Sequence, residues 1–102
     1  MNTTISETKT PNLKVSKKGN TFKILEVTAE TDALMPPHLS TNEAVVIVQE
    51  GDAVLEINGT TNHLTQNDVF VVPAATAHTL SIKSKFKAVV IMELDSQIEF
   101  VN

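Results

Sequence analysis

The sequence predicts an all-β protein, a sandwich or barrel of short strands. Three observations lead to this fold class. The apolar runs are short and rich in Val and Ile, the pair Asn58-Gly59 stands between two of them, and prolines end others. No segment carries a helical period of any length, and 102 residues are enough for one domain with one modest core.

The chain divides into a polar arm and one domain. Residues 1–11 are rich in Thr and Ser and end at Pro11, so we expect a flexible N-terminal arm. Residues 12–102 are expected to form a single barrel domain. Its expected strands are the runs TFKILEV (21–27), AVVIVQE (44–50), AVLEING (53–59), TTNHLT (60–65), DVFVVP (68–73), HTLSIK (78–83), KAVVIMEL (87–94) and QIEFV (97–101).

Two local signals place turns and strand ends. Asn58-Gly59 predicts a two-residue hairpin, because both central positions of a type I′ turn have φ > 0. The run from Asp68 to Pro73 is expected as a buried strand that the proline stops, since proline has no N–H for a sheet ladder.

The composition excludes several classes of protein. A formal net charge of −4 argues against a nucleic-acid surface and against a polybasic membrane contact. The first residues lack the apolar stretch of a signal peptide, and no apolar run is long enough to span a bilayer. The chain has no Cys, which removes disulfides and thiolate chemistry and fits a cytoplasmic protein.

Two segments resemble the two motifs of the cupin family. The first is HLSTNEAVVIVQEG, to be compared with the family pattern G-x5-H-x-H-x3-E-x6-G. Counting back from Gly51 puts Ala44 at the glutamate, Ser40 at the second histidine and His38 at the first. Asp32 then stands where the family has its leading glycine.

The second segment is NDVFVVPAATAH, to be compared with G-x5-P-x-G-x2-H-x3-N. Pro73 and His78 match, while Asn67 and Ala75 stand at the two glycines and Ile82 at the final asparagine. Together the two segments imply a jelly-roll barrel, also described as a double-stranded β-helix. The resemblance covers residues 32–82 directly.

Strand periodicity gathers a pocket from these residues. Side chains i and i+2 share a face, so His38 and Ser40 point the same way, as do Ala44 and Val46 on the next strand. His78 joins them from a third strand. We expect a small molecule to bind among these five residues.

The resemblance also implies a possible metal site. Imidazoles and a carboxylate that converge from several strands suit Fe, Mn, Ni or Zn. This chain keeps only His38 and His78 of that ligand set, so we expect no cofactor, or else a divalent metal on these two residues. Glu43 is one residue out of register and would reach the site only through a bulge, and His63 is expected to point outward beside the inward Leu64.

Three functions agree with this pattern. The first is a small cupin that binds a small molecule or serves as a metal-free dimer. The second is a metal-dependent enzyme, a dioxygenase or isomerase, with two histidine ligands. The third is a sensor module, which in this family is often fused to a DNA-binding domain; this chain is too short to include one.

We also expect a homodimer. Val45 and Ile47 lie on the face of their strand opposite the pocket-facing residues. An apolar outer face on a small barrel either lies under a second layer or forms an interface. The apolar C-terminal IEF (98–100) and the N-terminal arm are candidates to extend the contact by strand pairing.

Overall fold

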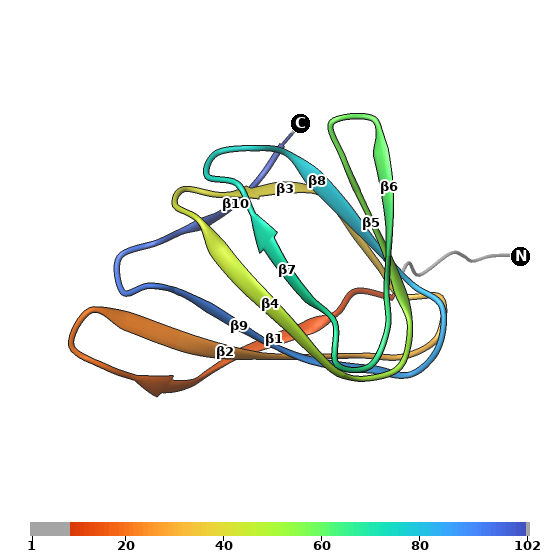
Figure 1. The fold of residues 1–102 in the computed structure, drawn as a ribbon, viewed down its shortest axis with the longest axis horizontal. Helices are drawn as coiled ribbons and strands as arrows, with labels where there is room; N and C mark the ends of the chain where they lie inside the picture. Colours follow the sequence, from red (N-terminus) through yellow and green to blue (C-terminus); the bar gives the residue numbers. More distant parts are fainter. Residues whose placement is uncertain (1–8, 102) are drawn as a thin grey trace, which may run out of the picture.

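Two antiparallel five-stranded sheets face one another across a shared core (Figure 1). The computed structural model describes residues 9–101. The expected arm at residues 1–11 therefore lies outside the described residues except for its last three. The strands are β1 (Asn12–Lys18), β2 (Phe22–Ala29), β3 (Leu34–Ser40), β4 (Ala44–Glu50), β5 (Ala53–Ile57), β6 (Thr60–Leu64), β7 (Val69–Val72), β8 (His78–Ile82), β9 (Phe86–Glu93) and β10 (Ile98–Phe100).

Most consecutive strands lie in different sheets; only β1 with β2 and β5 with β6 follow each other within one sheet. One sheet has the order β1-β2-β9-β4-β7 and the other the order β10-β3-β8-β5-β6. The expected all-β barrel is confirmed, and residues 9–101 contain no helix. Within that range there is accordingly no helix of the length and apolarity that crossing a membrane requires.

The core lies between the sheets and is made of aliphatic side chains with one aromatic ring. Its most deeply buried members include Val48, Ile82 and Phe86, which are each at most 2 % exposed. Alternation along each strand accounts for this, since every second residue of β4, β8 and β9 faces the opposite sheet.

Each expected run contains a strand, and the strand assumed at His38 and Ser40 is β3, but β1 is not expected from the sequence. In β1 the apolar residues Leu13 and Val15 alternate with polar ones, and they pair with Val27 and Leu25 of β2. The lysine-rich composition of this edge strand hides a weak period-2 pattern.

The expectation that the Asp68–Pro73 run is buried is wrong for half of β7. Val69 and Val71 are 61 % and 53 % exposed, while Phe70 and Val72 face the interior. β7 is an edge strand, and no other element of the described chain covers its outer face. A run of four apolar residues looks the same in sequence whether one or both of its faces are buried.

The backbone takes a left-handed conformation at the positions where the sequence motifs place glycine. Asp32, Asn67 and Ala75 have φ of 72°, 76° and 54°. By the resemblance described above, these three residues align with motif glycines, and Gly is the residue that adopts such angles without steric cost. At the expected hairpin, Asn58 and Gly59 have φ of 52° and 73°, as a type I′ turn requires.

Gly51 is held by a close approach of backbone. Its φ is +86°, and a Cβ at this position would overlap the carbonyl oxygen of Lys85. Gly59 has a similar φ of +73°, but a Cβ there would meet nothing within 4 Å. Alanine at Gly59 therefore adds only the free-energy cost of a left-handed backbone. Alanine at Gly51 adds that cost and the cost of steric overlap with Lys85.

We predict that Gly51→Ala destabilises the fold by about 3 to 5 kcal/mol, because backbone strain and overpacking add. The matched control Gly59→Ala is expected to cost about 1 to 2 kcal/mol, from strain alone. Urea denaturation of both variants measures the difference. Equal losses of unfolding free energy would contradict the crowding at Gly51.

Candidate functional site

The pairing of β3 with β8 sets His38 directly opposite His78. Because directly opposed residues of neighbouring strands leave the sheet on the same face, the two imidazoles lie side by side. Their ring centroids are 4.1 Å apart with 57° between the ring planes. Both side chains are buried.

A backbone carbonyl orients each ring. His38 Nδ1 lies 2.7 Å from the carbonyl oxygen of Pro36, and His78 Nδ1 lies 3.0 Å from that of Thr76. A carbonyl oxygen only accepts, so in each case Nδ1 carries the hydrogen and donates it. In its neutral form each imidazole has only this one N–H, so its Nε2 is then an acceptor.

Ser40 adds a hydroxyl to the same face of β3. It lies two residues after His38 and is 4 % exposed. Its Oγ has no hydrogen-bond partner among the described residues. Such a group is uncommon, because a buried polar atom without a partner costs about 1 to 3 kcal/mol.

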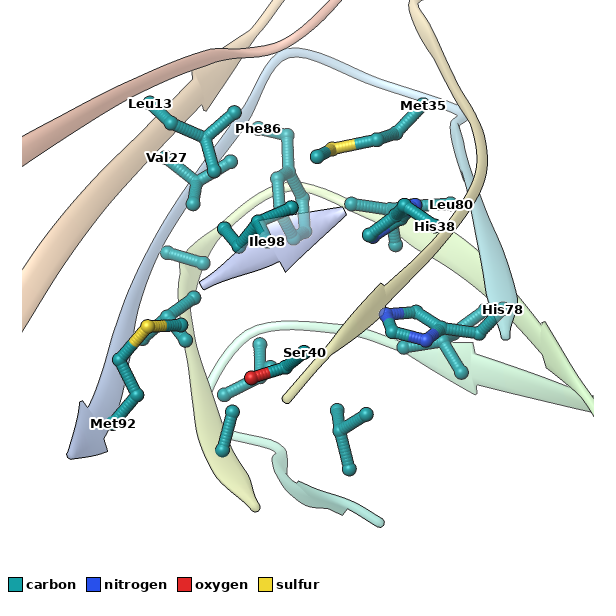
Figure 2. A pocket seen from close by; sticks show the side chains of 16 residues that line it. Leu13, Val27, Met35, His38, Ser40, His78, Leu80, Phe86, Met92 and Ile98 are labelled. Carbon is teal, nitrogen blue, oxygen red and sulfur yellow. The ribbon is translucent and has the colours of Figure 1, made fainter. Parts of the chain in front are cut away.

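These three side chains line a cavity between the two sheets with a volume of about 70 Å³ (Figure 2). Ala44 and Val46 of β4 line it from the opposite sheet, so the structure brings all five expected pocket residues together. The rest of the lining is apolar and comprises Leu13, Val27, Met35, Leu55, Val72, Leu80, Phe86, Ala88, Val90, Met92 and Ile98.

Sequence reasoning missed the long side chains in this lining. Met35 lies just before the two prolines of β3, where a bulge separates it from His38. Leu13 belongs to β1, the strand that the sequence did not reveal. In β9, by contrast, alternation alone places Val90 and Met92 on the inward face. The sequence does not show that this face forms a wall of the pocket.

The electrostatics of the cavity favour uncharged groups. No Asp, Glu or Lys side chain belongs to the lining described here, and the chain has no Arg. Burial lowers the pKa of His38 below 6.5, the hydrogen bond to Pro36 opposes this change, and the charge of His78 lowers the pKa further. The lowered pKa of His38 favours its neutral form at neutral pH.

Two other candidates lie away from the cavity. Glu43 is exposed and precedes β4 rather than lying in a bulge of it. His63 is exposed on β6 while Leu64 is buried, as expected. Neither residue adds a ligand to the two histidines.

The donor set does not fit a complete metal site. Among residues 9–101 no group of three or more His, Cys, Asp or Glu side chains is close enough to hold an ion. Two imidazoles contribute no negative charge, and facial sites for Fe, Mn or Ni use a carboxylate as well. We therefore derive no reaction step through a metal.

Comparison with solved structures confirms the architecture. A cupin superfamily protein from Desulfitobacterium hafniense superposes with a TM-score of 0.76 at 17 % identity, over 90 % of this chain and 84 % of that one. An uncharacterized conserved protein with a double-stranded β-helix domain from Klebsiella pneumoniae gives a TM-score of 0.80 at 16 % identity, over 96 % and 90 %.

One similar structure is an enzyme. Salicylate 1,2-dioxygenase from Pseudaminobacter salicylatoxidans gives a TM-score of 0.71 at 19 % identity. The match covers 78 % of this chain but only 25 % of the dioxygenase, so the likeness is one of fold.

Sequence comparison gives the family. No protein of curated function shows significant sequence similarity to the chain. The family model described as "Cupin domain" matches residues 25–93, well over half of the chain. The chain belongs to the cupin family.

Proposed function

We propose that the chain binds a small, uncharged molecule in the cavity between its sheets, without a catalytic metal. The observation that carries this proposal is the buried Oγ of Ser40, which has no partner among the described residues although it lies in an apolar cavity. A polar group held at such a cost is explained when a ligand completes its hydrogen bonds.

The three polar side chains indicate the groups of that ligand. Nε2 of His38 and of His78 accepts, and the hydroxyl of Ser40 both donates and accepts. A ligand hydroxyl or amide supplies the matching donor and acceptor together. The remainder of the ligand is apolar, because aliphatic and Met side chains make up most of the lining.

The same lining disfavours charged ligands. A carboxylate finds no Lys or Arg to pair with in this lining, and burial lowers the pKa of His38, which disfavours its cationic form. A cationic ligand finds no Asp or Glu in the lining. Burying either ion without a partner costs several kcal/mol, roughly.

The cavity volume limits ligand size. Benzene binds in an engineered apolar cavity of about 150 Å³ in another protein. At about 70 Å³, this cavity suits a smaller molecule, or one admitted by movement of Met35 and Met92. Methionine adapts in this way because its chain is unbranched and flexible.

We predict that cyclopentanol binds at least about tenfold more tightly than cyclopentane or cyclopentanecarboxylate, because only the alcohol matches the polar groups without charge. Chemical-shift titration by NMR measures the three affinities. Ser40→Ala is expected to remove most of the preference for the alcohol over the hydrocarbon. Ser81→Ala, a half-buried serine of β8 outside the cavity lining, is the control.

The Ser40→Ala variant should also keep or gain stability in the absence of ligand, because it removes a buried hydroxyl without a partner. A loss of more than about 1 kcal/mol in unfolding free energy would show that Oγ has a partner in the folded chain. Equal affinity of the parent for all three probes would contradict the proposed ligand class.

The lowered pKa of His38 predicts a pH dependence of stability. Between the folded pKa and about 6.5, the unfolded chain binds more protons than the folded chain. The contribution of His38 to the unfolding free energy is therefore fully present above pH 6.5. It decreases as the pH falls through 6.5 and stops decreasing below the folded pKa. Thermal melting between pH 5 and 8 should show a steeper loss in the parent than in His38→Gln.

His63→Gln is the control for this measurement, because it removes an imidazole from the exposed side of β6. It should keep the parent's slope. A parent melting temperature that rises as the pH falls from 7 to 5 would contradict a buried neutral His38.

Rebuilding a metal site tests the enzyme alternative. Ser40 and Ala44 face the cavity beside the histidines, so Ser40→His with Ala44→Glu adds an imidazole and a carboxylate. We predict weak Ni(II) or Zn(II) binding by the parent and tighter binding by the double variant, measured by calorimetry. The apo double variant should be less stable than the parent, and saturating metal should stabilise it.

A folded double variant without added affinity would contradict the position of Ser40 and Ala44 beside the two histidines. A parent that keeps about one ion per chain through purification would favour the metal-dependent enzyme instead.

A further inference from the structure

One side of the barrel lies between the edge strands β1 and β10. These strands belong to different sheets, and no backbone hydrogen bond joins them in the described chain. Leu13 of β1 and Ile98 of β10 nevertheless line the same cavity, as Figure 2 shows. Within residues 9–101, side chains therefore close the cavity between these two strands.

The opposite side of the barrel is closed in a different way. The edge strands there, β6 and β7, follow one another in the chain, and backbone hydrogen bonds hold the turn between them to β4. The N–H of Asn67 donates to the carbonyl of Val48 with N and O 2.8 Å apart, and the N–H of Val48 donates to the carbonyl of Asp68 at 2.9 Å. A route into the cavity is therefore opened more easily between β1 and β10.

Apolar side chains on the inward faces of β1 and β10 are incompletely buried. Val15 is directly opposite Leu25 and Phe100 directly opposite His38, so both point inward with these buried partners. Val15 is nevertheless 43 % exposed and Phe100 60 % exposed. Together with two half-buried cavity residues they form an apolar strip, which we name the seam: Leu13, Val15, Ile98 and Phe100.

The polar groups of the cavity lie one strand away from the seam. Ile98 is directly opposite Ser40, and the ring centroid of Phe100 is 5.9 Å from that of His38. Neighbouring strands are about 4.8 Å apart, and an extended carbon chain covers this distance in about four bonds. A molecule held at Ser40 thus reaches the seam with about its fourth carbon atom.

We infer that the ligand is an unbranched aliphatic molecule whose uncharged polar end binds at Ser40 and the two histidines, and whose chain leaves the barrel through the seam. This inference rests on the function proposed above and names its ligand class. The cavity of about 70 Å³ is smaller than the roughly 150 Å³ that takes benzene, so a longer ligand needs an exit. The seam supplies it, because its side chains continue the apolar lining.

Two lysines lie on the same inward face beyond Met92. Lys23 is directly opposite Met92, and Lys18 is directly opposite Lys23. Nζ of Lys23 donates to the carbonyl oxygen of Ser96 at 2.9 Å, whereas Lys18 is exposed. The competing ligand is thus a fatty acid bound in reverse, with its carboxylate at Lys18 and its chain inside. That direction leaves Oγ of Ser40 without a partner, so the uncharged end inside is favoured.

A series of unbranched primary alcohols from 1-propanol to 1-octanol tests the exit. Affinity should rise about threefold for each added methylene through the whole series, because the seam covers part of every added group. NMR titration in competition with cyclopentanol measures each dissociation constant. An affinity that is highest at about four carbon atoms and falls beyond them would indicate a sealed cavity and overturn the inference.

Substitutions in the seam test the path of the chain. Val15→Ser and Phe100→Ser should each weaken 1-octanol about threefold or more and leave 1-propanol unchanged, because only the longer alcohol reaches them. Val71→Ser is the control, since Val71 is 53 % exposed on the outer face of β7, and it should change neither affinity. An equal loss of 1-octanol affinity in the control, or an equal loss of 1-propanol affinity in both seam variants, would contradict the path through the seam.

Two further comparisons separate the remaining outcomes. 1-Octanol should bind more tightly than octanoate, and tighter binding of octanoate that is lost in Lys18→Gln would overturn the direction of the ligand. If neither cyclopentanol nor 1-propanol binds, the proposed function fails together with this inference. If both bind and 1-octanol does not, the proposed function stands and the exit through the seam is wrong.

Discussion

The register between β3 and β8 is the constraint on which the site depends. It sets His38 opposite His78, so two imidazoles share one inward face. A shift of one residue in either strand would turn its histidine outward. The bulge between Met35 and His38 is part of this constraint, because it contains Pro36, whose carbonyl accepts the Nδ1 hydrogen of His38. The prolines thus fit an inner strand by occupying its bulge, and the bulge fixes a tautomer.

The cavity holds three polar side chains within an otherwise apolar lining. His38, Ser40 and His78 are enclosed by aliphatic, Met and Phe side chains that offer them no partner. Among the described residues the hydroxyl of Ser40 lacks a partner and so lowers stability, whereas each histidine has a backbone carbonyl as the acceptor for its Nδ1 hydrogen. In the opposite sheet, Ala44 and Val46 of β4 face the cavity, while Val45 and Ile47 alternate with them and point to the outer side.

Much of the site follows from local periodicity, and the rest depends on pairing. Alternation puts His38 and Ser40 on one face of their strand and Ala44 and Val46 on one face of theirs, and the resemblance to the cupin motifs implies that these residues and His78 surround one space. The orienting carbonyls of Pro36 and Thr76 depend on turns and a bulge, which the counting does not contain. The sequence does not predict β1, because its lysines mask the alternation of apolar residues. The exposure of Val69 and Val71 depends on the place of β7 at a sheet edge.

The central claim is that both imidazoles donate from Nδ1 and present Nε2 as an acceptor inside the cavity. Long-range ¹H–¹⁵N correlation NMR of the uniformly ¹⁵N-labelled protein near pH 7.5 tests it directly, since it distinguishes the protonated from the unprotonated ring nitrogen. We expect His38 and His78 both to be in the Nδ1–H form, while the exposed His63 exchanges between tautomers. An Nε2–H form of either His38 or His78 would contradict the account, because that ring would then have no acceptor to offer a ligand.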